Sequence, residues 1–147
     1  MRIAALSTIL LLLSPAFTAG AQEASPLGQW RTIDDHSGKP HSIVEVYAAS
    51  DGTLSARIVR LLDLSKGPNP MCDACRGAHH GKPVVGMVIA WGLRRDGASW
   101  SGGRILDPDN GKEYAVKFTP GKDGNTLEVR GYIGMPMLGR TQAWQRE

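Results

Sequence analysis

The chain has 147 residues, a formal net charge of +3 and 21% charged residues. This length suits one domain with its own hydrophobic core, and no apolar run beyond the N-terminal stretch is long enough for a membrane helix. The basic residues are scattered, so a pI of about 9.1 does not by itself indicate binding to nucleic acid or anionic lipid.

The N-terminus has the parts of a secretory signal peptide. Met1 and Arg2 supply the charge, residues 3–13 are almost continuously apolar, and Ala19-Gly20-Ala21 is a small-residue cleavage pattern. An apolar run of about 11 residues is too short to span a bilayer, which disfavours the alternative of a membrane anchor. We therefore expect residues 1–21 to be removed, residues 22–147 to form one domain, and the mature protein to be periplasmic or secreted.

Eight segments after the signal peptide have the alternation or composition of β-strands, and short turns join most of them. They are residues 27–33, 41–48, 54–62, 84–93, the two arms of a hairpin within 100–114, residues 125–133 and residues 139–146. The hairpin turn is Asp107-Pro108-Asp109-Asn110-Gly111, because proline fixes φ and Asn-Gly tolerates positive φ. Gly102-Gly103 interrupts the first arm and indicates a bulge where the sheet bends.

Closure of these strands removes the exposed edges that an open sheet would leave. We therefore predict an all-β fold, an eight-stranded antiparallel up-and-down barrel, with a two-sheet β-sandwich as the alternative. Residues 63–83 lack strand character and form a long loop, and loops of this length are often functional or disordered.

The long loop contains the most reactive group of side chains, which are Cys72, Cys75, His79 and His80. In an exported protein two cysteines this close favour a disulfide that acts as a local staple. Zinc or copper binding by the two cysteines and two histidines is an alternative, as is redox exchange. Asp107-x-Asp109-x-Gly111 superficially resembles a calcium loop, but the rest of that ligand pattern is missing.

Several motifs together resemble the DUF2147 family of exported bacterial proteins, a family of unknown function. They are Gly28-x-Trp30, Pro83-x-x-Gly86, the residues from Trp100 to Tyr114, Arg130-Gly131-Tyr132-Ile133-Gly134, and the residues from Leu138 to Arg146. The resemblance implies a barrel similar to lipocalins and other calycins. It also implies that Trp30 closes the floor of the barrel beneath an arginine of the last strand, for which Arg140 and Arg146 are both candidates.

The last strand places Arg140, Gln142, Trp144 and Arg146 on one face by its two-residue period. If that face points inward, Arg140, Gln142 and Trp144 line a cavity, and Arg130 and Tyr132 of the preceding strand are expected to join them. Such polar groups in apolar walls are typical of small-molecule sites. The alternative is that this face is outward and solvated.

These patterns favour an exported barrel that binds an unidentified small molecule, without a cofactor, nucleic-acid partner or membrane insertion. No serine nucleophile elbow, phosphate loop or paired-histidine zinc helix is present, so we predict that the protein is not an enzyme. An envelope protein-interaction module is the main alternative, and a metal or redox role for the cysteine loop is the lesser one.

Overall fold

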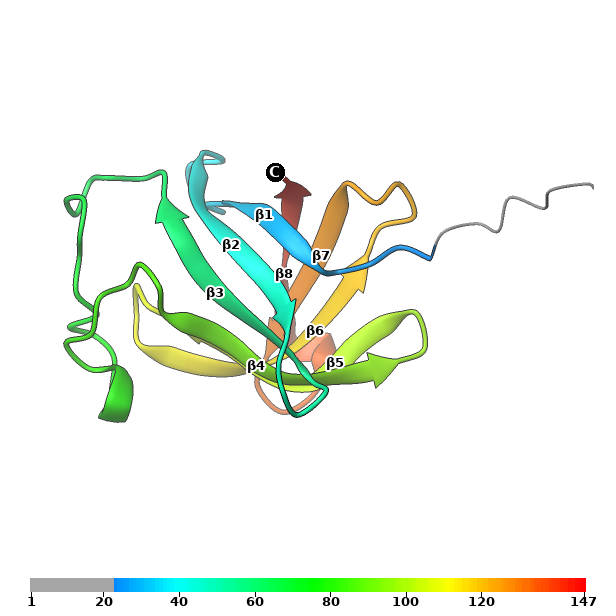
Figure 1. Cartoon of the computed structure of the whole chain (residues 1–147). Coiled ribbons are helices and arrows are strands. Elements are labelled where there is room, and N and C mark those ends of the chain that lie inside the picture. Colours follow the sequence, from blue (N-terminus) through cyan, green and yellow to red (C-terminus); the bar gives the residue numbers. More distant parts are fainter. Residues whose placement is uncertain (1–22) are drawn as a thin grey trace, which may run out of the picture.

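The computed structural model describes residues 23–147, so the predicted signal peptide, residues 1–21, lies outside the described residues. Eight antiparallel strands follow one another around a closed barrel, and β1 pairs with β8 to complete it (Figure 1). The strands are β1 (Gly28–Ile33), β2 (Pro40–Ala48), β3 (Leu54–Leu61), β4 (Val88–Asp96), β5 (Ser99–Asp107), β6 (Lys112–Pro120), β7 (Thr126–Tyr132) and β8 (Gly139–Arg146). The predicted up-and-down barrel is confirmed, and the sandwich alternative is wrong.

One half of the barrel interior is filled by side chains. Alternate residues of each strand point inward, and the largest of those with almost no exposed surface are Trp30, Phe118, Leu93, Leu127, Val44 and Val46. The ring of Phe118 packs against Trp144 with centroids 5.8 Å apart. This packed half supplies the hydrophobic core that holds the strands together.

Glycines set two local departures from regular pairing. Gly102 has φ +77°, and the β5–β6 register shifts between Trp100 and Gly103, which is the predicted bulge. β4 begins at Val88 rather than residue 84, because Gly86, at φ +88°, donates its amide to the Ile58 carbonyl at 2.7 Å and turns the chain. The strand prediction there began four residues early.

The two ends of the barrel differ. The loops after β1, β3, β5 and β7 lie together at one end, here called the open end, because successive strands of an up-and-down barrel alternate in direction. The loop between β3 and β4 (green in Figure 1), residues 62–87, is ordered by a bridge between Met71 and Pro83 and by the Cys72 amide, which donates to the Lys82 carbonyl at 2.8 Å. It also contains the 3-10 helix η1 (Gly77–His79), and a second one, η2 (Pro136–Leu138), precedes β8.

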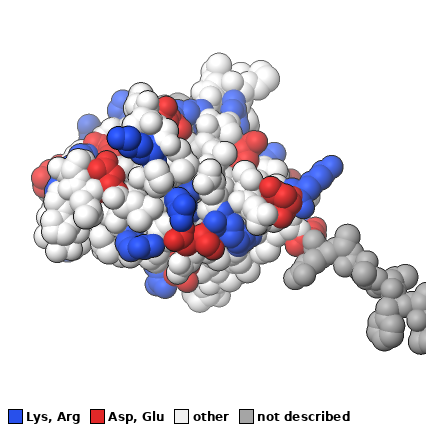
Figure 2. Space-filling view, turned by 90° about the horizontal axis from the view of Figure 1, so that it is seen from above, with Lys and Arg blue, Asp and Glu red and all other residues white. Residues whose placement is uncertain are grey.

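Basic and acidic side chains are interspersed over the face of the molecule in Figure 2. Ion pairs connect neighbouring strands, as between Arg57 and Glu45 at 2.6 Å. Within residues 23–147, no helix has both the length and the apolar character needed to cross a membrane.

Candidate ligand-binding site

The open half of the barrel is hollow. A cavity of about 460 Å³ lies there, and side chains from most of the strands form its apolar wall. The wall side chains include Ile58 of β3, Ile89 of β4, Leu106 of β5, Val129 of β7 and Trp144 of β8. A concave site of this size with apolar walls suits a small molecule.

Trp30 and Arg146 close the opposite end of the barrel. Trp30 is completely buried, and its indole Nε1 donates to the Pro26 carbonyl at 2.8 Å. The guanidinium carbon of Arg146 lies 4.0 Å from the centre of the Trp30 ring, a cation–π distance. The same guanidinium donates to three carbonyls, those of Ser25, Leu27 and Gly124. Arg146 rather than Arg140 therefore occupies the position over the tryptophan.

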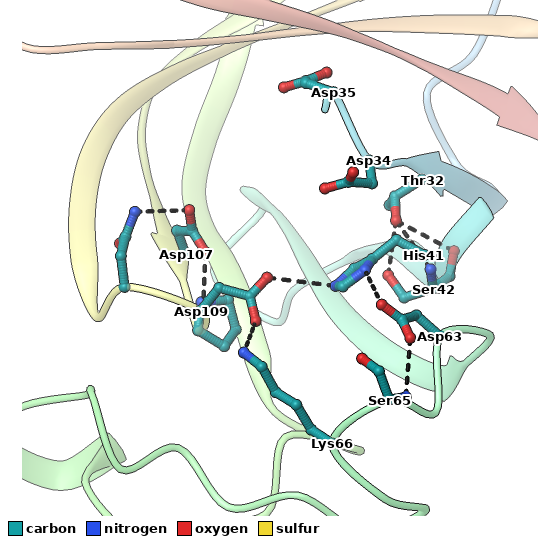
Figure 3. Close-up of polar contacts among 12 residues, drawn as sticks. Thr32, Asp34, Asp35, His41, Ser42, Asp63, Ser65, Lys66, Asp107 and Asp109 are labelled. Atoms are coloured by element: carbon teal, nitrogen blue, oxygen red, sulfur yellow. Dashed lines mark hydrogen bonds and ion pairs between the residues drawn. The ribbon is translucent and has the colours of Figure 1, made fainter. Parts of the chain in front are cut away.

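A cluster of charged side chains from the start of β2, the β3–β4 loop and the β5–β6 turn surrounds the mouth of the cavity (Figure 3). His41, at the start of β2, lies between two carboxylates, with Nδ1 3.8 Å from Asp63 and Nε2 3.5 Å from Asp109. Lys66 donates to the other Asp109 oxygen at 2.6 Å, and this hydrogen bond raises the pKa of Lys66. The cluster thus joins the β3–β4 loop to the β5–β6 turn.

Hydrogen bonds from nearby serines lower the pKa of two carboxyl groups at the mouth. The Ser65 amide donates to Asp63 at 2.9 Å, which lowers the pKa of Asp63. Asp34 accepts from the Ser37 amide at 2.7 Å, and its pKa is lowered first by the hydrogen bond with the Ser37 side chain and then by this amide. Both side chains therefore carry a negative charge at neutral pH.

A second polar network runs from the mouth into the cavity. Asp35 is ion-paired with Arg140 and accepts a hydrogen bond from the Gln142 amide nitrogen at 2.9 Å. Gln142 in turn accepts from the indole nitrogen of Trp144 at 3.1 Å. Arg140, Gln142 and Trp144 all line the cavity, so this face of β8 points inward.

Arg130 and Tyr132 lie on the outer face of β7, and their expected place in the cavity is corrected. The β7–β8 register pairs Arg130 with Thr141 and Tyr132 with Gly139, and directly paired residues share a face. Arg130 Nη1 donates to the Thr141 hydroxyl at 2.6 Å. Their neighbours Val129 and Gly131 line the cavity instead. The sequence gives the alternation within each strand but not the register between strands.

Cys72 and Cys75 form a disulfide, as predicted, and both are buried. With both sulfurs bonded to each other, neither is a thiolate that could bind a metal. His79 stacks on Trp91 with ring centroids 6.1 Å apart, and His80 Nδ1 donates to the Cys75 carbonyl at 3.0 Å. The alternative in which these two cysteines and two histidines bind zinc or copper is therefore corrected. Within residues 23–147, no three histidine, cysteine, aspartate or glutamate side chains are placed so that they could hold a metal ion.

The disulfide segment packs against the β5–β6 turn at the mouth. Cys72 Sγ lies 3.3 Å from the Pro108 carbonyl oxygen. Gly111 approaches the loop so closely that a Cβ there would lie 1.8 Å from the Ala74 carbonyl oxygen. Asp107 caps the turn itself by accepting from the Asp109 amide at 2.9 Å, which is the role of a turn residue.

The mouth residues Asp34, His36, His41, Asp63 and Lys66 were not identified from the sequence. A signal for them was present, because loops after the odd-numbered strands of an up-and-down barrel meet at one end. The turn-rich segments 34–40, 63–83 and 107–111 follow such strands, so their polar side chains converge.

Comparisons with known proteins agree with this architecture. No curated protein matches the chain. Among solved structures, it is similar to protein HP1028 from Helicobacter pylori, described as belonging to the lipocalin family, with a TM-score of 0.73 and 22% sequence identity over 84% of each chain. At that identity the likeness establishes the fold alone. A family model described as an uncharacterized protein conserved in bacteria (DUF2147) matches residues 28–146. The chain therefore belongs to the DUF2147 family and has a lipocalin-like barrel.

Proposed function

We propose that this protein binds a small, partly apolar molecule in the open half of its barrel and acts as a binding protein rather than an enzyme. The observation that carries the proposal is the contrast between the two halves, since side chains fill one and the other holds a cavity of about 460 Å³. The lipocalin family of the Helicobacter pylori neighbour supports the same class of function by analogy of fold.

We further propose that the protein works outside the cytoplasm. The signal-peptide pattern of residues 1–21 and the Cys72–Cys75 disulfide both support export to an oxidising compartment. Arg140, Gln142 and Trp144 are the proposed ligand contacts from β8, because they line the cavity and form one polar network with Asp35.

Native mass spectrometry of the protein purified from its own host tests the proposal. We expect a retained small molecule on the wild type and its loss in Val129→Phe, since Val129 is buried in the cavity wall and the larger ring occupies the space. Ala143→Phe is the matched control, because it adds the same ring at an exposed position of β8. If both variants retain the small molecule equally, the ligand binds elsewhere. If neither the wild type nor either variant retains a molecule, and a small-molecule screen finds no binding, the proposed function is contradicted.

A protein-interaction role is the second candidate, and the loop between β7 and β8 favours it. Ile133, Met135, Met137 and Leu138 are each at least 55% exposed there, at the open end of the barrel. Contiguous exposed apolar side chains often mark contact surfaces.

Cross-linking in intact cells distinguishes the two functions. An interaction module predicts a specific cross-linked protein that is lost when Met135 and Met137 are changed to serine. A binding barrel predicts ligand retention by that same variant, because neither methionine lines the cavity.

A further inference from the structure

The cavity has two zones that differ in polarity. Its wall is apolar at Ile58, Ile89, Leu106 and Val129, while charged side chains gather at the mouth. A molecule that fits both zones has an apolar body and one polar head. The sign of the charge at the mouth then selects the head.

Carboxylates outnumber cations around this cavity. Asp34, Asp63, Asp107 and Asp109 line it, against Lys66 and Arg140. Both cations are already paired, Lys66 with Asp109 and Arg140 with Asp35. Within residues 23–147, Asp34, Asp63 and Asp107 have no lysine or arginine within ion-pair distance. The mouth is therefore negative, although the chain as a whole carries a formal charge of +3.

In two of these carboxylates the serine amide bonds to one oxygen, Oδ1. The amides of Ser37 and Ser65 bond to Oδ1 of Asp34 and Asp63, respectively. Oδ2 of Asp63 faces the cluster, 3.8 Å from His41 Nδ1 (Figure 3). Hydrogen bonding lowers the pKa of both carboxyl groups, so their charge persists at neutral pH.

Resting on the proposed binding function, we propose that the ligand is an amphiphile with a cationic, alkylammonium-type head, seated among Asp34, Asp63 and Asp107 with its apolar body in the barrel. Tyr114 also lines the cavity and adds an aromatic side chain, which favours cations. An anionic head would meet these carboxylates and would have to displace Asp109 from Lys66 or Asp35 from Arg140.

Three probes with the same chain and different heads test the charge preference: decyltrimethylammonium, decanol and decanoate, each below its micellar concentration. Isothermal titration at neutral pH and low salt is expected to give binding at least about tenfold tighter for decyltrimethylammonium than for decanoate, with decanol between them. Added salt should narrow the difference, because screening weakens the attraction to the head but not the burial of the chain.

The variant Asp34→Asn/Asp63→Asn removes two charges and keeps the Oδ1 acceptors for the serine amides. We expect it to weaken decyltrimethylammonium binding by about tenfold and to leave decanol binding unchanged. Glu128→Gln, on the exposed outer side of β7, is the control and should change neither.

The outcomes separate this inference from the function on which it rests. The cationic head is contradicted if decanoate binds as tightly as decyltrimethylammonium, or if the double variant binds decyltrimethylammonium with unchanged affinity. Neither result contradicts the small-molecule-binding function itself. If none of the three probes binds and no ligand is retained from the host, both the cationic head and the binding function are contradicted.

Discussion

Trp30 and Arg146 form the floor that makes the open half of the barrel a cavity rather than a channel. Trp30 is completely buried and its ring lies beneath the guanidinium at 4.0 Å. Trp30→Ala is expected to cost about 3–5 kcal/mol of unfolding free energy, the usual range for removing a large buried aromatic. Trp30→Phe keeps a ring and loses the indole hydrogen bond to Pro26, so it should cost less. Urea denaturation measures both, and an unchanged midpoint for Trp30→Ala would show that the floor is dispensable.

The ionisation of Asp63 makes the stability of the folded protein depend on pH. Its pKa is lowered from 3.8, chiefly because the Ser65 amide donates to it, so the ionised form favours the folded state. This contribution is present above the ordinary value of 3.8 and is lost as the pH falls through the lowered folded value. Asp63→Asn should therefore be less stable than the wild type at neutral pH and should approach it in acid. Urea midpoints across this range measure the effect, and a constant gap at every pH would contradict it.

At the scale of elements, Gly111 sets how closely the β5–β6 turn meets the disulfide loop. Both Gly111 and Gly134 have positive φ, +71° and +76°, so alanine at either costs roughly 1–2 kcal/mol for the backbone alone. Only at Gly111 would the Cβ also collide with a backbone atom, the Ala74 carbonyl oxygen at 1.8 Å, whereas nothing lies within 4 Å at Gly134. Gly111→Ala should therefore destabilise more than Gly134→Ala in thermal unfolding. Equal losses would mean that the loop moves aside freely.

The disulfide fastens the same loop and does not hold the barrel together. Cys72→Ala/Cys75→Ala is expected to cost about 2 kcal/mol, because the ring it opens is short. Alanine is chosen because both positions are buried and a serine hydroxyl there would add its own burial cost. Circular dichroism should retain the β-sheet signal. Loss of that signal would assign the disulfide a role in the barrel itself.

The elements that local chemistry specifies were predictable. The turn at 107–111, the bulge at Gly102 and the shared face of Arg140, Gln142 and Trp144 each follow from residue type and the two-residue period, whereas the sequence left open whether that face points inward. The placement of Arg130 was not, because one step of register between β7 and β8 moves a side chain to the opposite face. The mouth cluster was missed for a related reason, since His41, Asp63 and Asp109 come from three separate segments that meet only in the closed barrel.

At the scale of the whole molecule, the packed core and the cavity lie in opposite halves of the barrel. The packed half around Trp30 and Phe118 supplies stability, and this allows the open half to hold a cavity. A cavity costs stability because its wall atoms lack packing partners. A ligand that binds only the folded state should raise the melting temperature, and the increase should continue with the logarithm of ligand concentration above the dissociation constant.

Closure of the barrel depends on its shortest seam, and we predict that this seam opens first. The β1–β8 register contains two pairs, Trp30 with Arg146 and Arg31 with Gln145, whereas β5–β6 contains six. Native-state hydrogen exchange should therefore show smaller opening free energies for the seam amides than for those of β5 and β6.

The ion pairs of Glu147 allow this prediction to be tested at the seam itself. Glu147 pairs with Arg31 at 2.7 Å and with Arg60 at 3.4 Å, and its amide donates to the Gln29 carbonyl at 3.1 Å. Glu147→Gln removes these exposed ion pairs and should lower seam protection by roughly 0.2–1 kcal/mol. Arg57→Gln removes the Arg57–Glu45 pair between β2 and β3 and should leave the seam unchanged. Seam amides as protected as those of β5 and β6, and insensitive to Glu147→Gln, would mean that the barrel opens only by unfolding as a whole.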